Sequence, residues 1–561
     1  MSPTPTPHSS TLRAWQLQTL QRLAEWREGP FLVSAAPGAG KTRPALELAR
    51  TLLAQRAIAR VAVLCPTTPL TRQWAAAAAA LGVQLEPDAA SAQPPRDFHG
   101  VAVTYARIAS DPRPWAASAG EDTLVIVDEA HHLGEELTWG ESFQRAFAGA
   151  PRWLLLSGTP FRSDATPIPG VRYDTHGLAE PDISYTYAQA VADGICRPVA
   201  FVTFDGTLSW RSGEQVIESS FETILTAREA SRRYRTAIST ELPDGLPRIL
   251  REAHAKLRAL REQGHRDAGG LVVAADAKHA RQIARLLGEV IGKAPLVVLH
   301  TEAQAARKLT DFRNSREPWI VAVNMVSEGV DIPRLRVGVY ATAAKTPLIF
   351  RQIVGRFVRT VPGRPPEPSW VYLPADPVLR THAAEVETEL RHVLRPRGED
   401  DQLEGFDERE GHERRTERSE AAEFVPLSAE FSPQMTLFGG ATRVESAPAR
   451  PTPAGAVPTL LPSPAVTEPM VLGSATVVER PAPAPAEGRP ATFERRSHLR
   501  AERSRLVAEL QRRGGGSHRE INAWINRKVG VGSVQTATIA QLERSVEALV
   551  KELVRRSRPG G

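Results

Sequence analysis

The chain has 561 residues and a net charge of +6, and 42% of its residues are hydrophobic. This length predicts several domains with large apolar cores, and the modest positive charge fits a polyanionic partner. The two cysteines, Cys65 and Cys196, exclude a disulfide framework and a cysteine-based zinc site. No apolar run reaches the roughly 18 residues of a membrane span, and residues 1–10 lack an apolar signal core. We therefore expect a cytoplasmic protein without membrane contact, from a bacterial or phage genome rich in Ala, Arg, Gly and Pro codons.

A phosphate-binding loop is the first feature along the chain. Residues 31–34 form a short apolar run typical of a buried strand, AAPGAGKT follows at 35–42, and residues 43–53 fit a helix. In this context glycines let backbone N–H groups and the helix N-terminus approach a phosphate. The sequence therefore predicts an ATP site with Lys41 on the β- and γ-phosphates and Thr42 on Mg²⁺. The loop residues expected to hold the nucleotide are Pro37, Gly38, Ala39, Gly40, Lys41 and Thr42.

An acidic pair follows another strand signal. Residues 123–127 are apolar and β-branched, and Asp128 and Glu129 come directly after them. A carboxylate at the C-terminal end of a parallel strand lies at the ligand edge of the sheet. We expect Asp128 to organise Mg²⁺ and Glu129 to orient and deprotonate the attacking water. A strand over 153–156 then ends in small residues placed to relay the nucleotide state, namely Ser157, Gly158 and Thr159.

The second half of the chain predicts another parallel sheet. Residues 270–275, 295–300 and 319–323 fit strands, and a helix is expected at 278–287. Further on, Arg356 and Arg359 are three residues apart, so we expect them on one face of a helix. For an isolated pair of this kind, a solvated basic face would be the favoured interpretation.

Several sequence blocks, taken in order, point to one protein family. They are LRAWQ at 12–16, AAPGAGKT at 35–42, CPTT at 65–68, TY at 104–105, DEAHH at 128–132, SGTPFR at 157–162, SEGVDIP at 327–333 and QIVGRFVR at 352–359. This series resembles superfamily 2 helicases of the DEAD/DEAH type, and most closely the branch of type III restriction subunits and bacterial DNA repair helicases. The resemblance covers about residues 11–375. It implies an α/β fold with two tandem RecA-like parallel-sheet domains and ATP with Mg²⁺ as cofactors.

The resemblance also assigns roles within the nucleotide cleft. It implies that Arg13 and Gln16 read the adenine, and that Gly329 and Asp331 line the cleft between the domains. Catalytic roles fall on Lys41, Asp128, Glu129, Gln352 and the arginine fingers Arg356 and Arg359, while His131, Ser157, Gly158 and Thr159 couple the nucleotide to movement.

Nucleic acid is expected to cross both domains on the side opposite the ATP cleft. Hydroxyl, amide and arginine groups bind phosphates without reading sequence, as a motor that steps along any sequence requires. By resemblance these contacts come from Thr67, Thr68, Arg72, Thr104, Tyr105, Thr301 and Ser327. Each of them is equally an ordinary cap or turn residue.

The composition changes after about residue 396. Residues 398–423 are dense in charge and residues 445–490 are rich in proline, so we expect a disordered linker over 396–492. Within it, QMTLF at 434–438 resembles the peptide by which bacterial replication and repair proteins hold the sliding clamp. Gln434, Leu437 and Phe438 would make that contact, although so short a match also recurs by chance.

Helical signals return at the C-terminal end. Helices are expected at 499–512, from Ser517 to 527 and from Thr538 to 553, the last two opening with capping boxes. Residues 491–561 hold 15 Lys and Arg against 7 Asp and Glu, which favours a DNA-binding module over a protein-docking bundle.

The expected domain organisation follows from these signals. It comprises a disordered N-terminus at 1–10, an ATP-binding domain at 11–200, a connector at 201–250, a second RecA-like domain at 251–395, the linker at 396–492 and a basic three-helix domain at 493–557. The leading hypothesis is an ATP-driven DNA helicase or translocase, moving 3′ to 5′ by family analogy. The alternatives are a duplex translocase or remodeller without strand separation, and a clamp-tethered DNA-binding scaffold. RNA is the less favoured substrate, and DNA cleavage would need a nuclease partner.

Overall fold

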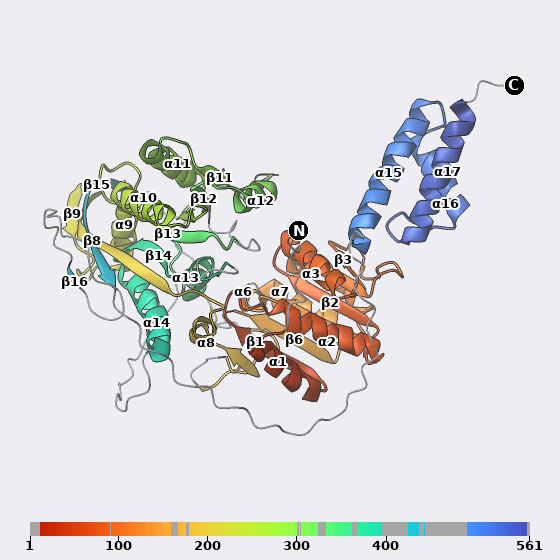
Figure 1. The fold of residues 1–561 in the computed structure, drawn as a ribbon, viewed down its shortest axis with the longest axis horizontal. Coiled ribbons are helices and arrows are strands. Elements are labelled where there is room, and N and C mark those ends of the chain that lie inside the picture. The colour runs from red at the N-terminus through yellow and green to blue at the C-terminus, as the bar shows by residue number, and fades with distance from the viewer. Residues whose placement is uncertain are drawn as a thin grey trace, which may run out of the picture.

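The computed structural model describes residues 12–557 except 90, 136, 159–166, 176–178, 300–301, 303, 324–331, 362–366, 395–423, 437–441 and 444–490. The described chain forms two sheets flanked by helices and a separate bundle of three helices (Figure 1). Within these residues, no helix has both the length and the apolar character needed to cross a bilayer.

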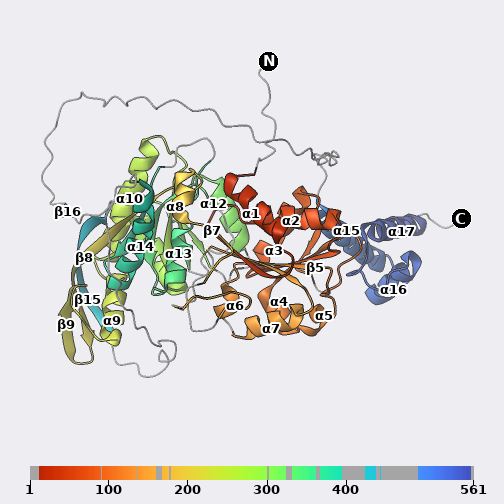
Figure 2. The same ribbon diagram turned by 90° about the horizontal axis from the view of Figure 1, so that it is seen from below.

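The first domain is built on a parallel sheet with the strand order β3-β4-β2-β5-β6-β1-β7. Its strands are β1 (Gly29–Ala35), β2 (Arg60–Cys65), β3 (Leu85–Pro87), β4 (Gly100–Thr104), β5 (Thr123–Asp128), β6 (Arg152–Ser157) and β7 (Ile183–Tyr185). Its helices are α1 (Ala14–Glu25), α2 (Thr42–Ala54), α3 (Thr68–Ala80), α4 (Tyr105–Ser110), α5 (Arg113–Ala116), α6 (His132–Glu135), α7 (Leu137–Phe147) and α8 (Tyr187–Ala192). Helices α1 to α3 lie on one face of the sheet and α4 to α7 on the other (Figure 2).

Burial on both faces explains the apolar strand sequences of this sheet. Every residue of β5 is buried, as expected for a central parallel strand covered by helices on each side. Because β1, β5 and β6 are parallel neighbours, their C-terminal ends meet at one edge, where Ser34 pairs with Ser157 and Asp128 with Leu156. The residues that follow these three strands are therefore brought together at that edge.

The second domain holds the other sheet, with the strand order β11-β12-β10-β13-β14-β8-β15-β16 and β9 paired to β8. The strands are β8 (Val199–Ser212), β9 (Gln215–Ser219), β10 (Gly269–Ala274), β11 (Leu296–Val298), β12 (Trp319–Val323), β13 (Leu335–Ala341), β14 (Ser369–Pro374), β15 (Phe424–Thr436) and β16 (Thr442–Arg443). The helices are α9 (Ala227–Ala237), α10 (Leu246–Glu262), α11 (Ala277–Ile291), α12 (Ala305–Asn314), α13 (Pro347–Val354) and α14 (Pro377–Leu394). The predicted fold class of two tandem α/β domains is thus confirmed.

The expected connector at 201–250 is instead an integral part of the second domain. Strand β8 pairs in parallel with β14 from Val199 to Phe204, and its Phe201, Phe204 and Trp210 side chains are fully buried. The prediction of a connector was wrong because these aromatic residues are spaced too irregularly to indicate a strand. These aromatic side chains are stabilised by packing against α9 and β15. Such tertiary contacts are not visible in the local sequence pattern.

Strand β15 corrects the expectation of a disordered linker over all of 396–492. It pairs antiparallel with β8 along its whole length, from Phe424 opposite Ser212 to Thr436 opposite Phe201. Gly206 makes this close approach possible, because a Cβ at that position would collide with the carbonyl oxygen of Glu430. Strand β15 contains Pro426 and Pro433, and prolines are tolerated near a sheet edge.

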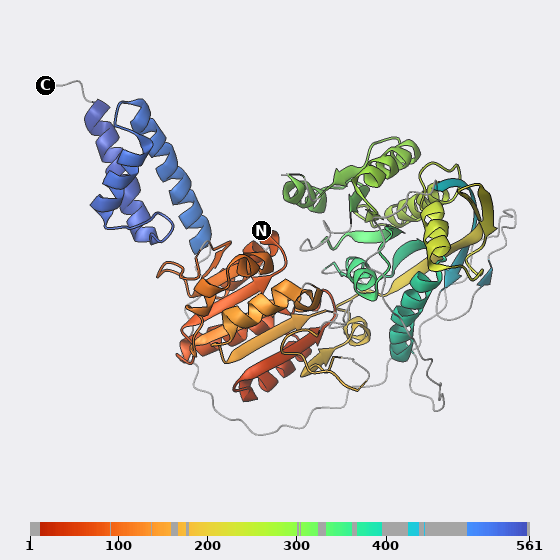
Figure 3. The same ribbon diagram turned by 180° about the vertical axis from the view of Figure 1, so that it is seen from behind.

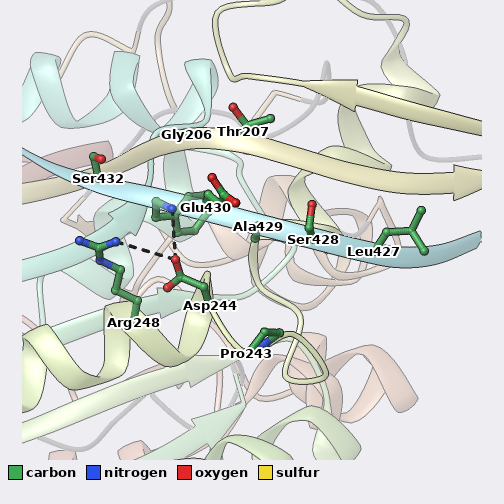
Figure 4. A pocket seen from close by; sticks show the side chains of 11 residues that line it. Gly206, Thr207, Pro243, Asp244, Arg248, Leu427, Ser428, Ala429, Glu430 and Ser432 are labelled. Atoms are coloured by element: carbon green, nitrogen blue, oxygen red, sulfur yellow. Dashed lines mark hydrogen bonds and ion pairs between the residues drawn. The ribbon is translucent and has the colours of Figure 1, made fainter.

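A groove of about 680 Å³ lies beside β15, between that strand and the first turn of α10 (Figure 4). In it, Asp244 Oδ2 accepts a hydrogen bond from the backbone N–H of Phe431 at 3.5 Å and lies 3.8 Å from Arg248 Nη1. These contacts fasten the outer edge of β15 to the helix.

The C-terminal bundle consists of α15 (Thr492–Arg512), α16 (His518–Val529) and α17 (Ile539–Ser557), which confirms the predicted helical domain. Its apolar core includes Val507, Ile525 and Leu549. The capping boxes predicted at Ser517 and Thr538 are present. The bundle extends from the β3 edge of the first domain, on the side away from the second sheet (Figures 1 and 3).

Candidate functional site

The loop between β1 and α2 has the backbone of a phosphate cradle. Gly38 and Gly40 adopt φ values of +83° and +89°, which favour glycine. A Cβ on Gly38 would lie 2.8 Å from Arg359 Cδ, and a Cβ on Gly40 would lie 2.9 Å from Gln16 Nε2. The loop is therefore enclosed by side chains from the N-terminal part of the chain and from the second domain, and only glycine fits these two positions without displacement of its neighbours.

Helix α1 is fastened to this loop by two polar side chains. Arg13 Nη1 donates to the carbonyl oxygen of Ala39 at 2.7 Å, and Gln16 Nε2 donates to that of Gly40 at 3.0 Å. The backbone N–H of Arg13 in turn donates to Gln16 Oε1 at 2.9 Å. These contacts place both residues at the loop, and their expected contact with adenine stays a prediction.

The acidic pair lies at the C-terminal end of β5, facing the loop. Asp128 Oδ2 accepts a hydrogen bond from Trp74 Nε1 at 2.7 Å, and Lys41 Nζ lies 3.2 Å from Glu129 Oε1. Burial, followed by the charge of Glu129, raises the pKa of Asp128. Burial alone would also raise the pKa of Glu129, but the nearby cationic groups, Lys41 first, lower it overall. Glu129 is therefore ionised at neutral pH, as a residue that orients and deprotonates water must be.

His131 joins three of the predicted motifs. Its Nδ1 lies 3.0 Å from Ser157 Oγ and 3.7 Å from Glu129 Oε2, while its Nε2 lies 3.3 Å from Gln352 Nε2. The ring is buried, with 3% of its surface exposed, so these polar neighbours surround it closely. The imidazole thus connects the acidic pair and the end of β6 with a helix of the other domain.

Gly158, which follows Ser157, lies close to the phosphate-loop lysine, because a Cβ on Gly158 would lie 3.3 Å from Lys41 Nζ.

The two arginines do not share a helix face, contrary to the sequence prediction. Helix α13 ends at Val354, so Arg356 lies in the turn that follows and Arg359 forms an isolated β-bridge with Cys196. Gly355 at the helix end allows close contact with the first domain, since a Cβ there would lie 2.9 Å from Pro37 Cβ. Arg359 reaches the phosphate loop from this bridge, packed against Gly38.

The residues of the cleft fit a nucleotide with a divalent cation. The glycine-lined loop, the Lys41 ammonium group and the Asp128 carboxylate provide donors for phosphate and an acceptor for a hard cation. Thr42 begins α2 immediately after the loop. The described residues hold no cluster of three or more His, Cys, Asp or Glu that could bind a metal without help. A Mg²⁺ ion here would therefore take most of its ligands from phosphate and water.

Two of the predicted nucleic-acid contacts are exposed, while the hydroxyls of two others are buried or used as a helix cap. Thr68 and Arg72 are exposed at the start of α3, and Arg72 Nε lies 3.2 Å from Asp88 Oδ2. The hydroxyl of Thr67 is buried without a hydrogen-bond partner, and Thr104 caps α4.

The expected contact of Tyr105 with nucleic acid is wrong, because the side chain is buried. It is 1% exposed, and its hydroxyl donates to the carbonyl oxygen of Asp128 at 2.5 Å. The aromatic ring packs in the core beside Trp139. Tyr105 therefore holds the backbone of Asp128 in place from the interior of the domain. The remaining predicted site residues lie outside the described part of the chain: Thr159, Thr301, Ser327, Gly329, Asp331, Leu437 and Phe438, as does the side chain of Gln434.

Sequence reasoning missed two residues of the cleft. Trp74 binds Asp128 from α3, and Cys196 Sγ donates to the carbonyl oxygen of Pro37 at 3.4 Å. Neither lies in one of the motifs, and a tryptophan within an alanine-rich helix would have been the only signal.

Two protein-family models match the chain. The model described as "Type III restriction enzyme, res subunit" matches residues 9–162, and the model described as "Helicase conserved C-terminal domain" matches residues 254–361. Among solved structures, the chain is similar to the DNA-bound ATP-dependent Type ISP restriction-modification enzyme LlaBIII, at 15% identity, with a TM-score of 0.44, over 68% of this chain and 30% of that one. A fragment of a putative HsdR subunit of a type I restriction enzyme from Vibrio vulnificus YJ016 matches at 18% identity, with a TM-score of 0.46, over 67% of this chain and 66% of that one.

Two relatives come from Mycobacterium tuberculosis. The uncharacterized protein MT2985 is 37% identical over 98% of this chain and 94% of its own length. The uncharacterized protein Rv2917 is 40% identical over 79% of this chain and 74% of its own length. Together with the two family models and the paired α/β domains, these matches show that the chain belongs to the superfamily 2 helicases, in one family with these mycobacterial proteins and resembling the type III restriction subunit.

Proposed function

We propose that this protein is a DNA motor, which couples ATP hydrolysis in the cleft between its two domains to movement along DNA. The observation that carries the proposal is the meeting of the two domains at the phosphate loop. Arg359 packs against Gly38, and Gln352 lies 3.3 Å from His131. A site built from both domains changes when the domains separate, so nucleotide turnover and domain movement are linked.

Each group in the cleft has a role in this proposal. Lys41 and the loop N–H groups hold the phosphates, while Thr42 and Asp128 are the protein ligands for Mg²⁺, which neutralises phosphate charge when bound. Glu129 orients the attacking water and accepts its proton. Arg359 and Arg356 stabilise the charge that develops on the transferred phosphoryl group.

His131 is the proposed relay between the domains. Because it touches Ser157, Glu129 and Gln352, a change at the γ-phosphate reaches α13 through one side chain. Exposed Thr68 and Arg72 then hold the DNA backbone on the first domain without reading its sequence. The choice of DNA is supported by the restriction-enzyme family model and by the positive charge of the chain.

The test is ATP hydrolysis by the purified chain with no nucleic acid, single-stranded DNA, duplex DNA or RNA. A matched Glu129→Gln variant keeps the shape of the side chain and removes the base. Stimulation by single-stranded DNA, abolished in the variant, supports a strand-tracking helicase. Stimulation by duplex alone supports a translocase that does not separate strands. Stimulation by RNA alone overturns the DNA assignment, and stimulation by none of them overturns the motor.

A further inference from the structure

The C-terminal bundle is held in a fixed place on the first domain by a buried arginine. Arg496 is 3% exposed and forms an ion pair with Glu86 of β3, and its guanidinium also lies over the ring of Phe98. A second tie joins the backbone N–H of Ile539 to Asp97 Oδ2 at 2.8 Å. Both contacts come from groups of the bundle and reach β3 or the loop after it, so they define one position of the bundle on the first domain.

This docking places the bundle beside the proposed DNA track. Two residues after Glu86, Asp88 accepts hydrogen bonds from Thr71 and Arg72 of α3. The helix that presents Thr68 and Arg72 therefore shares the β3 edge with the bundle. Figure 1 shows α15 rising from this edge next to α3. Helix α15 is the part of the bundle next to this edge, and α16 lies on the side of the bundle farther from the first domain (Figures 1 and 3).

Helix α16 is the helix of the bundle whose described cations form no ion pair at all, although Arg505 of α15 and Arg544 of α17 are also exposed without one. On α15 and α17, five exposed or half-exposed cations are each held by a glutamate three or four residues away: Arg512 and Arg513 by Glu509, Lys551 by Glu547, and Arg555 and Arg556 by Glu552. On α16 the single carboxylate, Glu520, is taken up by the capping box with Ser517. Within the described part of the chain, the exposed cations Arg519, Arg527 and Lys528 have no ion-pair partner.

The geometry of α16 places Arg519 and Arg527 on its outer side, while Lys528, nine residues after Arg519, projects toward the other flank of the helix. Ile521, Ile525 and Val529 face the bundle core, which leaves Arg519 and Arg527 on the opposite face. Two turns of helix separate them by about 12 Å along the axis, so they reach different phosphates of one backbone. Lys528 stands 4.9 Å from the centre of the Trp524 ring at the flank of this face.

A buried arginine beneath the same helix adds to the positive charge. Arg503 of α15 is 4% exposed, and its guanidinium donates to Asn522 Oδ1 at 2.7 Å and to Asn526 Oδ1 at 2.9 Å. Burial lowers the pKa of Arg503, but an arginine stays protonated at neutral pH. Because its partners are neutral amides, its charge is not cancelled, and it fixes the orientation of α16 at the same time.

We propose that the outer face of α16, formed by Arg519 and Arg527 and flanked by Lys528, is a second DNA-backbone site that holds the DNA strand beside the motor. The site is independent of sequence, since arginine and lysine side chains bind phosphates rather than base edges. Its distance from the ATP cleft means that it acts on DNA affinity and not on basal ATP turnover. The inference rests on the DNA substrate of the proposed function.

The test compares two triple variants of the full chain. Arg519→Gln with Arg527→Gln and Lys528→Gln removes three unpaired cations, and Arg512→Gln with Arg513→Gln and Lys551→Gln removes three cations that glutamates already neutralise. DNA affinity is measured by fluorescence anisotropy across a salt series without nucleotide, for single-stranded and duplex DNA. With about 0.7–0.9 unit of slope for each phosphate contact, the α16 variant is expected to lower the salt slope of log K by about 2–3. The control variant is expected to lower it by less than about 1.

The outcomes separate this inference from the proposed function. Equal losses of affinity in the two variants would mean that only bulk charge matters, and unchanged affinity in the α16 variant would mean that DNA does not touch this face; either result overturns the site. If the wild-type ATPase responds to DNA while the α16 variant binds DNA as tightly as the wild type, the motor function is supported and the DNA site on α16 is overturned. If DNA fails to stimulate the wild-type ATPase but the α16 variant alone loses DNA binding, the DNA site on α16 is supported and the proposed motor function is overturned.

Discussion

Gln352 and His131 meet across the cleft between the two domains, with Gln352 Nε2 3.3 Å from His131 Nε2. One residue lies on a helix of the second sheet, and the other follows the acidic pair of the first. Since the imidazole is also 3.0 Å from Ser157 Oγ, a neutral ring that accepts from the glutamine amide can donate to the serine. The buried His131 side chain thus contacts Ser157 of the first domain and Gln352 of the second.

Removal of this contact should uncouple the domains rather than empty the nucleotide site. In a double-mutant cycle, Gln352→Ala and His131→Ala are expected to show a coupling energy of about 0.5–3 kcal/mol in DNA-stimulated kcat, because each loses the same partner. ATP affinity should change little in Gln352→Ala. Steady-state kinetics of the two single variants and the double variant measure the coupling, and strictly additive effects would contradict it.

Arg359 is expected to act on the rate of hydrolysis. Arg359→Ala should lower kcat about 10³-fold, since an arginine that stabilises transition-state charge contributes on this scale. Arg359→Lys keeps the charge but lacks the planar fork, so it should recover only part of the loss. Arg351→Ala is the matched control, because Arg351 lies on α13 and pairs with Glu389 of α14. Similar losses for Arg359→Ala and Arg351→Ala would show that only the stability of the domain is affected.

Gly38 and Gly82 offer a comparison between two glycines with nearly the same backbone. Their φ values are +83° and +80°, so alanine at either position should cost about 1 kcal/mol of unfolding free energy. Only Gly38 has a close neighbour, because a Cβ there meets Arg359 while Gly82 has nothing within 4 Å. Gly38→Ala should therefore also weaken nucleotide binding, measured by titration with a fluorescent ATP analogue. Equal nucleotide affinity in the two variants would refute the role of the contact.

Trp74→Phe should weaken the response to Mg²⁺. The substitution removes the indole N–H from Asp128 and leaves a buried carboxylate oxygen without that donor, at a cost of about 1–3 kcal/mol in unfolding free energy. Half-maximal ATPase activity should then need more Mg²⁺. Trp153→Phe loses a comparable bond to a backbone carbonyl at 3.2 Å and serves as control. A Mg²⁺ requirement that shifts equally in both would argue against a specific role for Trp74.

Strand β15 should contribute to the stability of the second domain. Phe431 is 2% exposed and packs near Phe204 and Phe221, so Phe431→Ala is expected to cost about 3–5 kcal/mol. Leu427, 36% exposed on the same strand, should cost far less when replaced by alanine. Chemical denaturation and hydrogen exchange of the β8 amides measure both. Rapid exchange of β8 amides in the wild type would show that β15 is not stably paired.

The sequence was sufficient where local chemistry dictates structure. The phosphate loop needs glycine at positive φ and a strand before a helix, and both are visible in residues 31–42. The acidic pair follows a strand whose burial is evident from its apolar run. In the same way, the capping box of Ser517 with Glu520 fixes the start of α16.

Tertiary packing decided the features that the sequence did not reveal. Tyr105 carries no local sign that its hydroxyl reaches the backbone of Asp128, 23 residues away. Helix α13 ends at Val354, and the Gly355 that follows it lies close to Pro37 of the other domain. Strand β15 forms because β8 offers an unpaired edge more than 200 residues earlier, which no local pattern can indicate.

The docking of the bundle gives the chain a path that returns to its starting domain. The polypeptide leaves the first domain at β8, joins the second sheet as far as β16, and comes back to β3 with α15. Residues 444–490 connect these two parts of the chain in the sequence. The bundle is therefore held on the first domain by its own contacts with Glu86 and Asp97, although the chain reaches it from the second sheet. A single proteolytic cut in this stretch should leave both fragments in one complex.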